Sequence, residues 1–191
     1  MSMHKLLVSI AAGLAFTGTA LAEMPPVPKP GPEHEKLGYF VGKWNSEGSM
    51  KETPFGPGGK ITNHDDCQWF QGKFAVICNS TGSNPAGPTR SIGIISYSTE
   101  QSAYTFYGAD TSGTTQYTVP LGTIDGDTWT YKDTSKMGGQ MVTSRYVIKI
   151  LSPDSYAFHW DVQDADGTWN TVMEGKEMRV KAAAKPAKVK K

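Results

Sequence analysis

Short turn signals recur at regular intervals along most of this chain, and they constrain its fold more than any other feature. Combinations of Gly, Pro, Asn, Asp and Ser, such as Asp125-Gly126 and Asp166-Gly167, separate alternating runs rich in aromatic and β-branched residues. No helical pattern of about 10–15 residues intervenes, which excludes the parallel sheets of α/β proteins. About ten β-strands are predicted, at residues 42–51, 59–70, 74–81, 90–97, 103–109, 114–121, 127–134, 140–151, 155–163 and 168–179.

The short connections favour strands that pair antiparallel with their neighbours along the chain. A sheet of about ten strands tends to curl or close, and closure removes its exposed edges. We therefore expect one all-β domain over residues 34–180, an antiparallel up-and-down β-barrel in preference to a sandwich. One short helix is predicted before the first strand, at His34–Phe40, with Leu37 and Val41 on its apolar side.

The first 22 residues have the three-part pattern of a secretory signal peptide. Lys5 supplies a positive charge, residues 6–16 form an apolar run, and the small-residue site Ala20-Leu21-Ala22 follows. A transmembrane anchor is the alternative, but it needs about 20 continuous apolar residues, and Gly13 interrupts this run. We expect residues 1–22 to be removed and the mature, soluble chain to be exported to the periplasm or the extracellular space.

Two segments outside the expected domain have biased compositions. Residues 23–33 hold five prolines and predict an extended arm, and residues 181–191 hold five lysines and no acid, which predicts a disordered tail. Between residues 23 and 180, 13 Lys and Arg stand against 18 Asp and Glu. This acidic body argues against a nucleic-acid partner. Two roles stay open for the tail, a solubilising end or weak contact with anionic envelope surfaces.

Cys67 and Cys78 are the only cysteines, and an exported chain meets an oxidising compartment. They flank a predicted turn, and a four-residue loop at Gln71–Phe74 places Cys67 directly opposite Cys78 and Trp69 opposite Val76. Cross-strand Cα separations of about 4.5–5.5 Å suit a disulfide. A two-residue loop would shift the register and lose the pair. We expect a structural disulfide in preference to a redox role, because no C-x-x-C motif is present.

The segment Leu37–Trp44 resembles the G-x-W start of the calycins, the superfamily of lipocalins and fatty-acid-binding proteins. Over about Lys29 to Arg179 the chain also resembles a family of bacterial domains of unknown function, DUF1579. The stretches that carry this second resemblance are Pro30-Gly31-Pro32-Glu33-His34, Phe55-Gly56-Pro57-Gly58-Gly59, Cys67-Gln68-Trp69-Phe70, Met137-Gly138-Gly139 and Val172-Met173-Glu174-Gly175-Lys176. The family implies a fold but brings no established activity.

In calycins a short helix closes the barrel floor, the first-strand Trp packs on it, and a late-strand Arg often stacks over that Trp. The resemblance therefore implies that the predicted helix at His34–Phe40 closes one end of the barrel. It also makes Arg145 a candidate to stack over Trp44. An outward Arg145, on the same face as Lys149, is the alternative.

Alternation within the strands indicates which side chains point inward. Phe158 and Trp160 share the apolar face of one strand, opposite His159, and Thr171 shares a face with Met173. A barrel of this strand number is wider than side chains easily fill, so its interior could hold a ligand. The residues expected to line that interior are Trp44, Trp69, Tyr104, Phe106, Trp129, Arg145, Phe158 and Trp160.

Residue types that bind metals or perform catalysis occur without the required spacing. In His64-Asp65-Asp66, successive strand residues point to opposite faces, so we interpret a solvated strand segment and neither a metal site nor a glycosidase pair. Asp164–Gly167 lacks the first ligand of a calcium loop and fits a hairpin turn. His159 is interpreted as a surface or rim residue, with a haem ligand as the weaker alternative. We predict no metal, no cofactor and no enzymatic activity.

These observations favour a binding module, a secreted calycin-like barrel that takes a small apolar or amphipathic ligand. A filled barrel that acts through its surface, as a structural or interaction protein, is the alternative. A haem-binding barrel is the third hypothesis.

Overall fold

The structure is a computed structural model, and it describes residues 28–54, 56–111 and 118–181. A short helix α1 (Pro32–Lys36) and a 3₁₀ helix η1 (Leu37–Phe40) precede the strands. The strands are β1 (Gly42–Met50), β2 (Gly59–Trp69), β3 (Ala75–Asn84), β4 (Gly87–Ser98), β5 (Ala103–Asp110), β6 (Leu121–Asp125), β7 (Thr128–Met137), β8 (Gln140–Ser152), β9 (Ser155–Gln163) and β10 (Trp169–Arg179). The predicted signal peptide and nearly all of the predicted tail lie outside the described residues.

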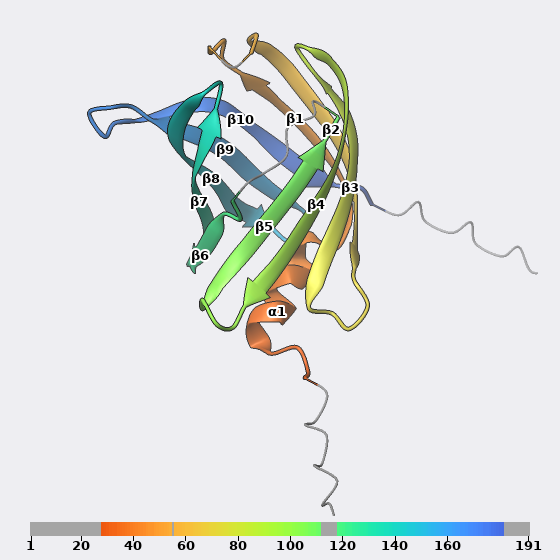
Figure 1. Cartoon of the computed structure of the whole chain (residues 1–191). Coiled ribbons are helices and arrows are strands. Elements are labelled where there is room, and N and C mark those ends of the chain that lie inside the picture. Colours follow the sequence, from red (N-terminus) through yellow and green to blue (C-terminus); the bar gives the residue numbers. More distant parts are fainter. Residues whose placement is uncertain (1–27, 55, 112–117, 182–191) are drawn as a thin grey trace, which may run out of the picture.

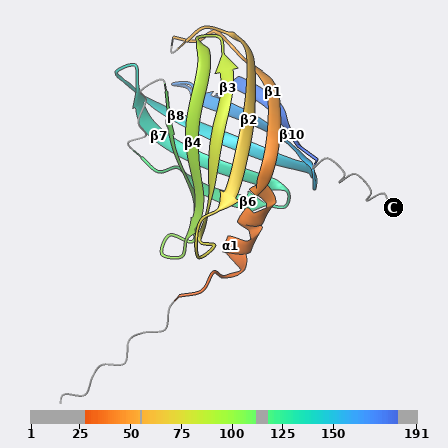
Figure 2. The same ribbon diagram turned by 90° about the vertical axis from the view of Figure 1, so that its right-hand side faces the viewer.

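Each strand pairs antiparallel with its neighbour along the chain, and β10 pairs with β1 to close the sheet (Figure 1). The predicted all-β up-and-down barrel is therefore confirmed. Viewed from the side, β2, β3 and β4 form the wall that lies opposite β7 and β8 (Figure 2). This opposition decides which side chains can face each other across the interior.

One strand lies elsewhere than predicted. A strand was predicted at 114–121, whereas β6 spans Leu121–Asp125 and residues 118–120 are not in a strand. Pro120 explains the late start, because proline has no N–H to donate to a strand ladder. Residues 114–117 of the expected strand lie outside the described residues.

The N-terminal helix begins earlier than predicted. It starts at Pro32, with Gly31 in extended conformation before it, so the last two residues of the expected proline-rich arm belong to the helix. Proline suits this first helical position, where an N–H has no partner within the helix. The Gly31 backbone N–H donates to His34 Nδ1 over 3.2 Å and fixes the start of the turn.

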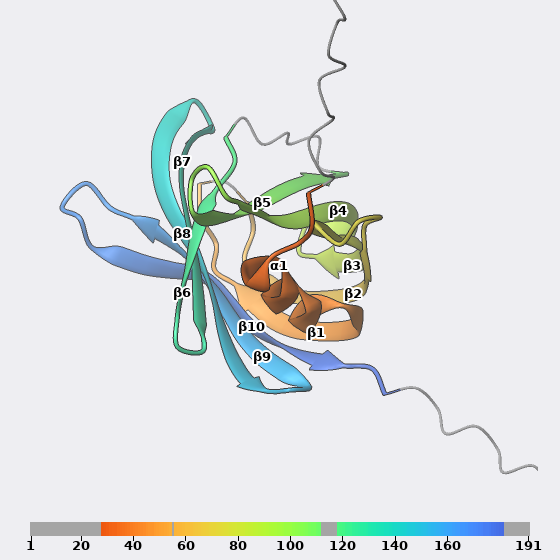
Figure 3. The ribbon, with the colours of Figure 1, turned by 90° about the horizontal axis from the view of Figure 1, so that it is seen from below.

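The two helical segments cover one end of the barrel (Figures 1 and 3). Leu37 is fully buried there, and the Phe40 ring lies 5.1 Å from the Trp129 ring. Trp44 Nε1 donates to the Phe40 carbonyl over 2.8 Å, so the first-strand Trp is tied to the helix. The hydroxyl of Tyr104, in β5, donates a hydrogen bond to the Glu33 carboxylate of α1. The floor that the calycin resemblance implied is confirmed.

The arginine on Trp44 is Arg179. Its guanidinium carbon lies 4.0 Å from the Trp44 ring centroid, and its Nη1 and Nη2 donate to the carbonyls of Val41 and Tyr39 over 2.6 and 2.7 Å. The expectation that Arg145 stacks over Trp44 was wrong. The reason is register, because Arg179 of β10 pairs directly with Trp44 of β1.

Arg145 lies instead on the outer face of the barrel. Its guanidinium carbon lies 4.4 Å from the Trp169 ring centroid, and its Nε donates to the Asp161 carboxylate over 2.7 Å. A register shift in β10 between Thr171 and Met173 contributes to this outer cluster. Thr171 donates to Asp161 over 2.8 Å, whereas Met173 faces the interior, so these two residues do not share a face as predicted.

The predicted register of the β2–β3 hairpin is confirmed. Cys67 lies opposite Cys78 and Trp69 opposite Val76. The Sγ atoms of the two cysteines are joined in a disulfide. This bond holds two neighbouring strands together on the inner side of the barrel wall.

Candidate functional site

A cavity of about 550 Å³ occupies the barrel interior above the floor. Phe40 and Trp44 lie at its base. Further up, Gly93 of β4 and Gly108 of β5 pair with each other and line the cavity, and the Phe106 ring packs over Gly93. The barrel interior is therefore not filled by its own side chains.

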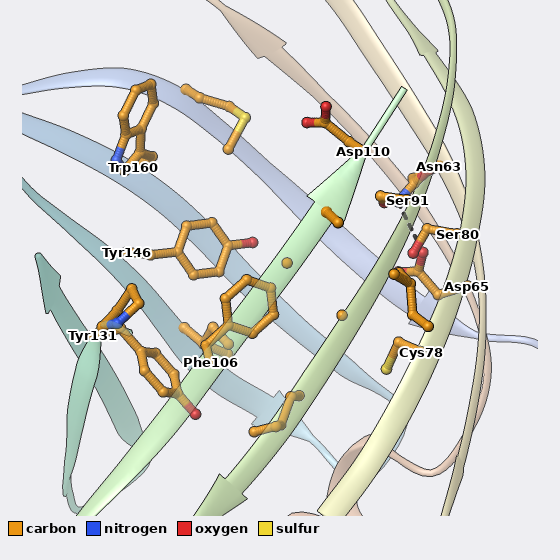
Figure 4. A pocket seen from close by; sticks show the side chains of 18 of the residues that line it. Asn63, Asp65, Cys78, Ser80, Ser91, Phe106, Asp110, Tyr131, Tyr146 and Trp160 are labelled. Carbon is orange, nitrogen blue, oxygen red and sulfur yellow. Dashed lines mark hydrogen bonds between the residues drawn. The ribbon is translucent and has the colours of Figure 1, made fainter. Parts of the chain in front are cut away.

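The cavity has two unlike sides. One side, the aromatic wall, consists of Phe106, Tyr131, Tyr146 and Trp160 from β5, β7, β8 and β9. The other, the polar wall, consists of Asn63, Asp65, Ser80, Ser91 and Glu177 from β2, β3, β4 and β10. Figure 4 shows the four aromatic side chains facing Asn63, Asp65, Ser80 and Ser91 across the open space. The interior is therefore amphipathic.

Strand alternation places Asp65 inside. Cys67 is buried, so Asn63 and Asp65, two and four residues earlier in β2, point to the same inner side. His64 points outward and its Nδ1 lies 2.7 Å from Asn45 Oδ1. The interpretation of His64-Asp65-Asp66 as a solvated segment was therefore wrong for Asp65. Alternation counted from Cys67 was the signal that could have identified it.

Asp65 of β2 and Glu177 of β10 form a carboxyl pair on the inner side of β1, the strand between them. Asp65 pairs with Trp44 and Glu177 pairs with Ser46, and the small Ser46 lets the two carboxyl groups come within hydrogen-bonding reach. Asn63 Nδ2 donates to Asp65 Oδ1 over 2.8 Å. Glu177 is only 6% exposed, which makes it one of the most buried acidic side chains among the described residues.

The environment of the pair favours a bound proton. Burial, with the nearby charge of Asp65, raises the pKa of Glu177 to about 8, although a hydrogen bond with Tyr156 opposes the shift. Burial also raises the pKa of Asp65, and hydrogen bonds with Ser80 and Glu177 partly offset it. Glu177 is thus mostly protonated at pH 7, and the two carboxyls titrate as a coupled pair.

Two buried polar atoms at the cavity have no hydrogen-bond partner among the described residues, Glu177 Oε2 and Tyr131 Oη. Burial strongly raises the pKa of the Tyr131 hydroxyl, which therefore stays neutral. Unpaired buried polar groups are rare in folded proteins, and each needs a reason. Here one of them lies on each side of the cavity.

The eight predicted lining residues have different positions. Trp44, Phe106 and Trp160 line the cavity. Tyr104, Trp129 and Phe158 are buried in the core around it, and Trp69 packs below, against Gly38 of the helical floor. Arg145 lies outside. Four further lining residues were not predicted from the sequence: Asp65, Tyr131, Tyr146 and Glu177.

His159 is on the outer face of β9, with its side chain 38% exposed and its Nε2 3.5 Å from Asp161. It does not line the cavity, so its position does not favour a haem ligand inside the barrel. Burial raises the pKa of Asp161, but hydrogen bonds from Arg145 and Thr171 and the charge of His159 outweigh it and lower the pKa. Within the described residues, no three His, Cys, Asp or Glu side chains gather as a metal site.

The closed antiparallel barrel, its helical floor and the Arg-stacked Trp of the first strand define a calycin-like barrel protein. Within this class, the chain belongs to the family DUF1579, described as a protein of unknown function, whose model matches residues 29–179. No curated protein matches the sequence. No helix among the described residues has the length and apolar character needed to cross a membrane.

Two solved structures show the same fold at low sequence identity. The crystal structure of Rv2717c from M. tuberculosis has a TM-score of 0.57 and 13% identity, and the match covers 79% of this chain and 99% of that one. An S-type phycobiliprotein lyase, CPES from Guillardia theta, has a TM-score of 0.56 and 12% identity, over 79% of this chain and 94% of that one. At these identities the likeness concerns the fold alone.

Proposed function

We propose that this protein is an exported binding module that holds one small apolar or amphipathic ligand inside its barrel. The observation that carries the proposal is the cavity of about 550 Å³ between an aromatic wall and a polar wall. Small-molecule sites have volumes of about 300–1,000 Å³ and combine apolar surface with a few polar groups. The cavity favours this function over a filled barrel that acts only through its surface.

Export is part of the proposal and rests on two observations. The first 22 residues have the pattern of a signal peptide. The disulfide between Cys67 and Cys78 is compatible with an oxidising compartment. We place the mature protein in the periplasm or the extracellular space, and a weak contact between the lysine-rich tail and anionic surfaces stays a secondary proposal.

The neighbour from Guillardia theta is named a lyase, so this architecture also occurs in a protein with an enzyme's name. For the present chain we propose binding without catalysis, because its sequence lacks the catalytic motifs considered above.

Binding can be tested with the neutral apolar dye N-phenyl-1-naphthylamine, which fluoresces strongly in apolar surroundings. The purified protein should enhance the dye's emission saturably, with one site per chain. Ser91 lines the cavity, so Ser91→Trp should fill part of it and lower the dye's affinity. Arg90→Trp is the matched control, because the neighbouring Arg90 is exposed on the outer face.

Two results would reject the proposal. One is a folded wild-type protein that leaves the dye's emission unchanged. The other is an equal enhancement by Ser91→Trp, which would place the dye outside the barrel. If the dye binds inside the barrel, lipid extraction of the protein purified from its natural host, followed by mass spectrometry, would identify any ligand carried through purification.

A further inference from the structure

We infer that the Asp65–Glu177 carboxyl pair is a subsite for the positively charged nitrogen of an amphipathic ligand whose apolar body lies against the aromatic wall. The inference rests on the proposed function and narrows its ligand to cationic amphiphiles, aromatic amines above all. Its structural basis is a pair of acids on the cavity wall, a buried Glu177 beside a partly buried Asp65, for which the described residues supply no ion-pair partner.

Buried carboxyl groups in proteins are normally matched by a cation or a full set of hydrogen bonds. Glu177 is 94% buried, and one of its oxygens has no hydrogen-bond partner in the described part of the chain. None of the ion pairs among the described residues includes Asp65 or Glu177. The missing partner of this pair is therefore a hydrogen-bond donor, and a cation would match it best.

Arg179, the closest candidate for an internal cation, is already engaged. It is two residues from Glu177 in β10, but its guanidinium stacks on Trp44 and donates to the carbonyls of Val41 and Tyr39. Those bonds hold the floor together and direct the positive charge away from the cavity. Arg179 therefore serves the fold, and Glu177 is left for a ligand.

The charges around the cavity have the same sign preference. The ionisable acids that line it are Asp65, Asp110, Asp133 and Glu177, whereas the only lining base among the described residues is Lys136. A low-dielectric space in which groups of one sign of charge predominate attracts the opposite sign. An organic cation is favoured there, and a fatty-acid carboxylate is disfavoured.

The aromatic wall suits the remainder of such a ligand. Tyr146 and Phe158 stack behind one another, with ring centroids 5.9 Å apart and planes 25° apart, so this wall offers flat surfaces. Aromatic rings pack favourably on such faces, and their electron-rich faces also attract cations. The two walls together match a molecule with a planar apolar body and one amino group.

A bound cation changes the protonation of the pair. It favours the ionised form of both carboxyls, so Glu177, whose raised pKa keeps it mostly protonated at pH 7, should release a proton on binding. The titratable groups that interact with Glu177 are Asp65 from β2, Tyr146 from β8, Tyr156 from β9 and Tyr39 from η1. The tyrosines do not titrate near pH 7, because burial raises their pKa values.

The experiment compares three probes that differ only in the head group: 1-naphthylmethylamine, 1-naphthylmethanol and 1-naphthoate. Isothermal titration calorimetry at pH 7 should give the amine the highest affinity, about tenfold or more above the alcohol, and the carboxylate the lowest. Glu177→Gln and Asp65→Asn should each remove most of the preference for the amine. Glu174→Gln, an exposed acid on the same strand, is the matched control and should keep it.

Proton release provides a second readout that needs no variant. Titrations of wild-type protein with the amine in buffers of different ionisation enthalpy should reveal release of a proton on binding, up to about one per ligand. The alcohol should release none. If a variant fails to fold, as judged by circular dichroism, this comparison still decides the matter.

The outcomes separate the inference from the function beneath it. If the neutral dye and the naphthalene alcohol bind inside the barrel but the amine is not preferred and releases no proton, the cationic subsite is rejected and the binding module stands. A preference for 1-naphthoate has the same consequence. If no probe binds to the folded protein, the binding module itself is rejected.

Discussion

At the scale of single residues, Gly42 and Arg179 explain the G-x-W motif. Gly42 has a φ of +131°, a conformation that favours glycine. A Cβ at this position would also lie 2.6 Å from Arg179 Nη1. Glycine is therefore required where the guanidinium passes to reach Trp44, two residues further along β1. The glycine of the G-x-W motif therefore indicates that an arginine side chain from a late strand passes here, although the motif does not show which arginine it is.

Replacing Arg179 should destabilise the floor. Arg179→Ala removes the stack on Trp44, the two short bonds to the carbonyls of Val41 and Tyr39, and the ion pair with Asp154. We expect a loss of about 2–4 kcal/mol in the free energy of unfolding, measured by urea denaturation. Arg90→Ala, at an exposed position, should change it by less than about 0.5 kcal/mol. Equal effects of the two variants would contradict the role of Arg179.

Glu177 should make stability depend on pH. Its pKa rises from an ordinary 4.5 to about 8 on folding, so the folded state binds a proton that the unfolded state has lost between those values. The free energy of unfolding contributed by this group is fully present below about pH 4.5 and falls as the pH rises to about 8. Glu177→Gln cannot ionise, so its denaturation curve should shift less over this range and the variant should be more stable than wild type at pH 9.

The control for this prediction is Glu174→Gln, on the exposed side of β10. It should reproduce the pH dependence of the wild type. Thermal unfolding of the three proteins at pH 5, 7 and 9 tests the sign directly. A wild-type protein that becomes more stable from pH 5 to pH 9 relative to Glu177→Gln would contradict a raised pKa.

The same residues show why the polar wall was harder to predict than the aromatic residues. Large aromatic side chains are usually buried, so residue type alone was enough to predict Phe106 and Trp160 as lining residues. Asp65 and Glu177 are residue types that usually face water, so their inner position can be inferred only from register. For Glu177, the inner position can be inferred only by counting alternate residues of β10 back from Arg179. Counting forward from Thr171 gives the wrong face, because a register shift lies between Thr171 and Met173.

At the scale of elements, the turn residues were enough to predict hairpin register, whereas they gave no indication of irregularities within a strand. The loop Gln71–Phe74 was sufficient to place Cys67 opposite Cys78, because loop length sets hairpin register. The shift between Thr171 and Met173 has no comparable signal, since an extra residue in a strand leaves composition unchanged. It turned Trp169 and Thr171 outward and created the cluster around Arg145 and Asp161.

The disulfide of the β2–β3 hairpin should contribute modestly to stability. It closes a short loop, with 11 residues of sequence separation, for which the chain-entropy model gives at most about 3 kcal/mol. The double variant Cys67→Ala/Cys78→Ala should therefore unfold at lower urea concentration yet keep the barrel's circular dichroism spectrum. Treatment of wild type with a reductant should lower stability to a similar degree and leave the variant unaffected.

Mass spectrometry gives the most direct check on the same element. The non-reduced mature protein should contain no thiol that reacts with an alkylating reagent. Two alkylated cysteines in protein isolated from the cell envelope would contradict the disulfide in the native compartment. They would also weaken the argument for export, which rests partly on this bond.

At the scale of the whole molecule, the barrel is closed unevenly. β9 pairs with β8 and β10 along nearly its full length. In contrast, β6 pairs with β5 only at Gly122 and Leu121, opposite Tyr104 and Thr105. The β5–β6 seam is thus the weakest connection of the described sheet. Local opening in proteins follows such differences in pairing.

This unevenness predicts where the barrel opens first and what a ligand does to it. Amide hydrogen exchange in the peptide covering β6 should be at least about tenfold faster than in β9, which corresponds to about 1.4 kcal/mol less protection. Phe106 of β5 and Tyr131 of β7 flank the seam and both line the cavity, so a bound ligand contacts both sides. Saturation with N-phenyl-1-naphthylamine should therefore slow exchange in β6 and leave β9 unchanged.

Ser91→Trp, with its cavity partly filled, should show little ligand-dependent protection. Uniform protection of both strands by the dye would indicate general stabilisation of the fold, and would reject a ligand that bridges the seam.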